Sequence, residues 1–107
     1  MHLLYYFASA PNNNFSDMEK IDHACTMATF ATKVSLVFSD AGINYLSNDR
    51  PEPYKKVLLA LHYFGIEEII VITENPDETS NQKLLLSPTF CNRQAYLKLK
   101  QSAAMVF

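Results

Sequence analysis

Residues 67–72 read EEIIVI and contain the most strongly β-branched run of the chain. Such a run is typical of an interior strand that is covered on both faces. Two other short apolar runs, LLYYF at residues 3–7 and VSLVF at residues 34–38, are also expected to be strands. These three segments predict the interior of a β-sheet, and the stretches between them decide how its strands are connected.

Helical patterns occupy the stretches between these strands. Ser16 can cap a first helix, with Glu19 reaching back to it, and the apolar spacing continues to about Thr32. Asp49 can cap a second helix, which Gly65 closes. Strands that alternate with helices imply right-handed crossovers between parallel strands.

The last third of the chain continues this alternation. Residues 73–82 are polar and predict a loop or a short broken helix. Residues 84–86 predict a brief strand, residues 88–100 an amphipathic helix, and residues 104–107 a terminal strand. We therefore expect a single α/β domain over residues 1–107, built as a three-layer α/β/α sandwich around a mainly parallel sheet of about five strands.

The composition excludes several classes of function. A formal net charge of -2 provides no basic field that would neutralise phosphates, so direct binding of nucleic acid is not expected. Two glycines, Gly42 and Gly65, cannot form a glycine-rich phosphate loop. No apolar run is long enough to cross a membrane, and neither a metal site nor a cofactor motif is indicated. The two widely spaced cysteines fit a reducing, cytoplasmic compartment.

The functional site of an open parallel sheet usually lies beyond the carboxyl ends of its strands. There the sequence places Asp40 and Gly42 after the second strand, and Thr73 and Glu74 after the third. Gly42 can take a positive φ in its turn. Asp40 and Glu74 can form a carboxylate pair for acid–base chemistry, or they can be simple turn and cap residues.

The two cysteines have different expected environments. Cys25 lies on the apolar stripe of the first helix, where burial would raise the pKa of its thiol. Cys91 lies near the expected start of the last helix, where the positive end of the helix dipole can stabilise a thiolate. Cys91 is therefore the candidate catalytic or sulfur-carrying residue, and packing in the core is its alternative role.

Aromatic residues are numerous for a core of this size, with six tyrosines and seven phenylalanines. Tyr45, Tyr54, Tyr63 and Phe64 either fill the core or leave an aromatic patch for a partner subunit. The sequence alone leaves both possibilities open.

Four short stretches carry a family resemblance over nearly the whole chain. They are the first strand running into Ser9-Ala10-Pro11, the strand and turn at residues 37–43, the approach to the third strand at residues 65–68, and the terminal Val106-Phe107. In their order and spacing they resemble the DsrE/DsrF/DsrH group, and within it the DsrF/TusC branch. The resemblance implies a DsrE-like fold.

The resemblance also implies a cytoplasmic sulfur-relay complex of the DsrEFH or TusBCD type. In such complexes three related small subunits assemble as a hetero-oligomer and pass persulfide sulfur onward. The expected partners are a DsrE/TusD-like and a DsrH/TusB-like subunit. The sulfur ends in 2-thiouridine of tRNA in Tus systems, whereas the relatives in sulfur oxidisers serve intracellular sulfur oxidation.

The mobile sulfur of DsrE/TusD-like subunits is carried by a cysteine at the end of the third strand. Here residues 70–74 read IVITE, without a thiol. Because a persulfide must be held by a thiolate, we expect a non-catalytic subunit that positions a sulfur-bearing partner. The alternatives are a sulfur carrier that uses Cys91 and a stand-alone, homo-oligomeric binding module of the same fold.

Overall fold

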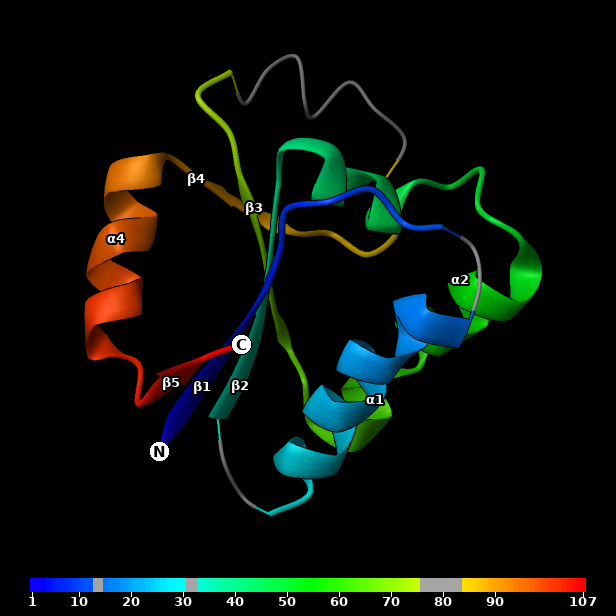
Figure 1. Cartoon of the computed structure of the whole chain (residues 1–107), viewed down its shortest axis with the longest axis horizontal. Helices are drawn as coiled ribbons and strands as arrows, with labels where there is room; N and C mark the ends of the chain where they lie inside the picture. Colours follow the sequence, from blue (N-terminus) through cyan, green and yellow to red (C-terminus); the bar gives the residue numbers. More distant parts are fainter. Residues whose placement is uncertain (13–14, 31–32, 76–83) are drawn as a thin grey trace.

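The computed structural model of the chain describes residues 1–12, 15–30, 33–75 and 84–107. Within these ranges, five parallel strands form one sheet in the order β4-β3-β2-β1-β5. Figure 1 shows α1 and α2 on one face of this sheet and α4 on the other. The predicted three-layer α/β/α sandwich with its parallel sheet is therefore confirmed.

The elements in chain order are β1 (His2–Phe7), α1 (Phe15–Ala28), β2 (Lys33–Ser39), the 3₁₀-helix η1 (Asp40–Leu46), α2 (Glu52–Leu59), the 3₁₀-helix η2 (Leu61–Phe64), β3 (Glu68–Ile72), β4 (Thr89–Cys91), α4 (Arg93–Ser102) and β5 (Met105–Val106).

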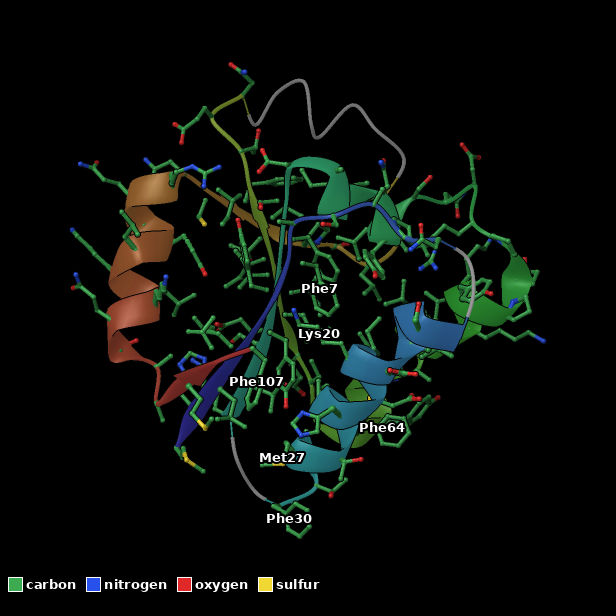
Figure 2. The ribbon with its side chains drawn as sticks, viewed as in Figure 1. Phe7, Lys20, Met27, Phe30, Phe64 and Phe107 are labelled. Carbon is green, nitrogen blue, oxygen red and sulfur yellow. The ribbon has the colours of Figure 1, made fainter. Side chains whose placement is uncertain are left out.

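The core has two layers, because side chains alternate between the faces of a strand. Tyr5 and Phe7 of β1 belong to the larger layer, beneath α1 and α2, whereas Leu4 belongs to the smaller layer, beneath α4. Lys20 of α1 donates to the carbonyl of Tyr6 and lies 4.8 Å from the centroid of the Phe7 ring (Figure 2). The stem and head of this lysine therefore fix α1 to the end of β1.

A network of polar side chains, which we call the polar track, links β1, β2 and β3 at the amino-terminal end of the sheet. The Oγ atom of the buried Ser35 donates to Glu68 Oε1 at 2.6 Å and lies 2.7 Å from His2 Nε2. Since the hydroxyl proton is used by Glu68, His2 Nε2 must donate to Ser35. Lys33 Nζ lies 3.2 Å from the second oxygen of Glu68 and completes the track.

The prediction of a positive φ at Gly42 was wrong, because Gly42 is not among the residues with a positive φ. A close approach of two backbones requires a glycine at this position instead. The 3₁₀-helix η1 follows β2 directly, and a Cβ on Gly42 would lie 1.9 Å from the carbonyl oxygen of Phe7. Asp40 has the positive φ instead, at 51°, which a short polar side chain tolerates. Gly65 has a φ of 91° and caps η2, as expected of a glycine that closes a helix.

The first helix is shorter than its apolar pattern predicts. It begins at Phe15, so Ser16 lies within it and does not precede it as an N-cap. It ends at Ala28, because the amide and the hydroxyl of Thr29 both donate to the carbonyl of Thr26 and tighten the last turn. The predicted end near residue 32 lies outside the described residues.

The second helix also differs at both ends. Its N-cap is Pro51 and not the predicted Asp49. The helix ends at Leu59, and the apolar pattern continues in η2, where Leu61 is buried and Phe64 is 44% exposed. A pattern of apolar side chains does not separate an α-turn from the tighter 3₁₀-turn that follows it.

The last third of the chain differs most from the prediction. Residues 84–86 do not form the fourth strand, because Leu86 has a φ of 63°, which interrupts an extended run. The fourth strand lies later, and α4 begins at Arg93 with the side chain of Asn92 as its N-cap. Cys91 therefore ends a strand and does not lie in the first turn of a helix.

The chain ends within the sheet, as predicted, on the edge strand β5. Phe107 donates its amide to the carbonyl of Leu4 at 2.8 Å and accepts from the amide of Tyr6 at 2.9 Å. Its ring stacks on that of Tyr5, with 4.7 Å between the ring centroids. In the described part of the chain, no helix is long and apolar enough to cross a membrane. Most of the loop predicted at residues 73–82 lies outside the described residues.

Candidate functional site

The carboxyl ends of β2, β3 and β4 form a continuous row at one edge of the sheet. Ser39 pairs with Ile72, and Ile72 pairs with Cys91, so the last residues of these strands are in register. The residues that follow them, Asp40, Thr73 and Asn92, consequently leave the sheet side by side. This edge is where parallel α/β proteins usually bind ligands.

Asp40 and Glu74 both contact Arg93, the first residue of α4. Glu74 Oε1 accepts from the backbone N–H of Arg93 at 3.0 Å, and Asp40 Oδ2 lies 3.8 Å from Arg93 Nη2. Glu74 thus occupies the positive end of α4, where a carboxylate is stabilising. The side chains of the Asp40–Arg93 pair are 69% and 55% exposed, so this pair contributes little to stability. These contacts fit capping and bridging roles and give no support to a carboxylate pair that shares a proton.

At the end of β3, near the point where the family resemblance would put a sulfur-bearing cysteine, the chain has Ile72, and Thr73 follows it. Its N–H donates to the carbonyl of Cys91 at 2.9 Å, which extends the pairing of β3 with β4 by one residue. Its hydroxyl oxygen accepts from the N–H of Asn75 at 3.0 Å. Thr73 therefore organises the turn after the strand.

Cys91 lines a cavity of about 280 Å³ at this edge, together with Thr73, Glu74, Phe90 and Asn92. Partial burial raises the pKa of the Cys91 thiol, and the negative charge of Glu74 raises it further. Since the α4 N-terminus begins after Asn92 and already holds Glu74, the predicted stabilisation of a thiolate by the helix dipole does not occur. The thiol of Cys91 stays protonated at neutral pH.

Sequence reasoning missed a set of contacts that fix α4 to the sheet. Tyr6 Oη lies 2.6 Å from Oγ of the buried Ser39, and the Tyr6 ring stacks on Tyr96 of α4 with 5.3 Å between centroids. Burial, with a contribution from Tyr6, raises the pKa of Tyr96. The signal that identifies these contacts is strand register, because Tyr6 and Ser39 lie on the same face of neighbouring strands.

The remaining candidate residues divide between core and surface. Cys25 is buried as predicted, and burial together with Asp22 raises the pKa of its thiol. Tyr45 and Tyr54 are partly buried, with their ring centroids 5.2 Å and 4.8 Å from the guanidinium carbon of Arg50. Tyr63 and Phe64, by contrast, are 81% and 44% exposed. Half of the aromatic set is therefore available to a partner. Across the described residues, no three His, Cys, Asp or Glu side chains are grouped to hold a metal.

Comparisons with known proteins test the fold. No model of a known protein family matches the chain, and no curated protein matches it. Among solved structures, the ychN protein from E. coli matches all of this chain and 97% of its own, with a TM-score of 0.71 and 14% sequence identity. At this identity the likeness shows the fold alone. The chain has the α/β fold of that protein, and the resemblance to the DsrE/DsrF/DsrH group, with its DsrF/TusC branch, stays a prediction.

Proposed function

We propose that this chain is a subunit of a cytoplasmic sulfur-relay complex that positions a sulfur-bearing partner without carrying sulfur itself. The observation that carries the proposal is the end of β3. There Ile72 and Thr73 replace a sulfur-bearing cysteine, and the Thr73 amide is bonded to the Cys91 carbonyl. A persulfide requires a thiolate, and this strand end provides none.

The same edge is suited to contact with another chain. Asp40, Glu74 and Arg93 present charges of both signs, and all three residues are exposed. Mixed charges at the rim of a surface favour one orientation of a partner over others. A partner with a persulfide on its own strand end would be held with that group beside a surface that cannot take the sulfur.

The proposed partners are related small DsrE/TusD-like and DsrH/TusB-like subunits in a hetero-oligomer. The proposed DsrF/TusC-type role gives two destinations for the sulfur, 2-thiouridine in tRNA or intracellular sulfur oxidation. The net charge of -2 argues against direct contact of this subunit with tRNA. The partners would therefore make that contact.

A second candidate function is a sulfur carrier that uses Cys91, because this thiol lines the open cavity at the strand ends. The raised pKa of the thiol opposes this role, since only the thiolate attacks sulfur donors. Homo-oligomeric binding without related chains is the third possibility.

Affinity purification from the native cytoplasm tests these alternatives. The tagged chain would be isolated with its partners, and the cysteines of each co-purifying protein would be scanned for persulfide by mass spectrometry. We expect related small α/β proteins to co-purify, with persulfide on one of them and none on this chain. The variants Cys91→Ser and Cys25→Ser, which remove the two thiols one at a time, should leave that pattern unchanged. Persulfide on Cys91 of the wild-type chain, lost in Cys91→Ser and retained in Cys25→Ser, would overturn the proposal.

A further inference from the structure

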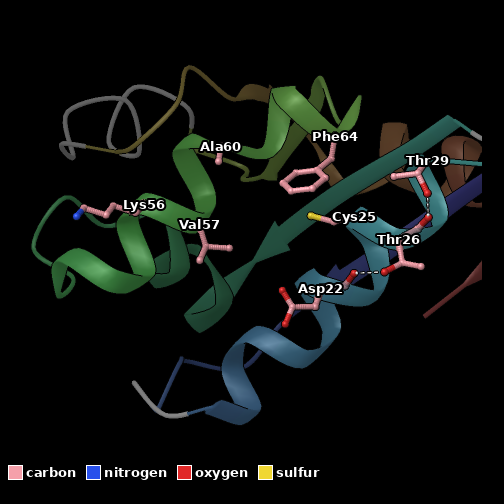
Figure 3. Close-up of a pocket in the computed structure, with 8 residues that line it drawn as sticks. All are labelled: Asp22, Cys25, Thr26, Thr29, Lys56, Val57, Ala60 and Phe64. Carbon is pink, nitrogen blue, oxygen red and sulfur yellow. Dashed lines mark hydrogen bonds between the residues drawn. The ribbon is translucent and has the colours of Figure 1, made fainter.

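We draw no further inference here: the strongest candidate, the apolar groove of about 620 Å³ between α1 and α2 in which Cys25 and Phe64 face each other (Figure 3), carries nothing because nothing in the structure shows what covers it.

Discussion

Replacing each of the two glycines by alanine separates two physical reasons for glycine in this fold. In Gly42→Ala the new Cβ would meet backbone atoms, 1.9 Å from the Phe7 carbonyl oxygen and 2.5 Å from its carbonyl carbon. Neither atom can rotate away, so η1 and the end of β1 must separate by roughly 1 Å in a tightly packed region. In Gly65→Ala no atom lies within 4 Å of the new Cβ, and only the φ of 91° opposes it.

The expected magnitudes follow from this difference. Overpacking costs about 1–3 kcal/mol and sometimes more, and a backbone clash without a rotamer escape lies at the upper end, so Gly42→Ala should cost about 3 kcal/mol. The reduced entropy of the unfolded chain offsets this by less than about 1 kcal/mol. Gly65→Ala should cost about 1–2 kcal/mol, the price of a left-handed conformation for an L-residue.

Urea denaturation at neutral pH measures both free energies of unfolding. Gly42→Ala should shift the midpoint further than Gly65→Ala, without a large change in slope. Gly65→Asn is a useful control, because asparagine tolerates a positive φ and should recover part of the loss. If Gly65→Ala is the more destabilising substitution, the packing of η1 against the end of β1 is wrong, and with it the position of Asp40 at the candidate site.

Three further results are expected. Ser35→Ala should destabilise the fold by about 1–3 kcal/mol in urea denaturation, because it leaves His2 and Glu68 without their buried partner. Burial raises the pKa of Glu68, but the hydrogen bond from Ser35 and nearby positive charges outweigh it and hold the pKa below the ordinary 4.5. The stability from Glu68 is therefore present above pH 4.5 and lost as the pH falls through the lower folded value, so Glu68→Gln should flatten the acid limb of the unfolding profile. Alkylation of Cys91 by iodoacetamide should be slower than that of a free peptide thiol. The substitution Glu74→Gln should accelerate this alkylation, because it lowers the pKa of the Cys91 thiol. Equal rates in the wild-type chain and in Glu74→Gln would contradict the role given to Glu74.

The interior of the sheet could be predicted from the sequence because helices cover these strands on both faces. Strands of this kind are continuous apolar runs, and β1, β2 and β3 each contain one. Residues 84–86 form a similar run but include Leu86 in a left-handed conformation. Backbone conformation at a single residue is decided by tertiary contacts, so the pattern alone placed the fourth strand too early.

The candidate site was predictable in its location and not in its contacts. Asp40, Thr73 and Glu74 follow strands whose carboxyl ends meet, which the alternation of strands and helices already implies. Arg93 and Asn92 were missed because the last helix was expected to begin earlier. The pairing of Tyr6 with Ser39 depends on the register of β1 and β2, which the sequence does not specify.

The position of the α4 start decides the chemistry of the whole edge. With a helix beginning at residue 88, Cys91 would lie among free backbone amides at a positive helix end, and its thiolate would be stabilised. With α4 beginning at Arg93, the carboxylate of Glu74 takes that end and raises the pKa of the thiol. Two consecutive residues after β3 bear on this chemistry: Thr73 has a hydroxyl and no thiol, and Glu74 disfavours a thiolate at Cys91 on β4. Both act in the same direction, because each leaves the strand ends without a nucleophilic sulfur.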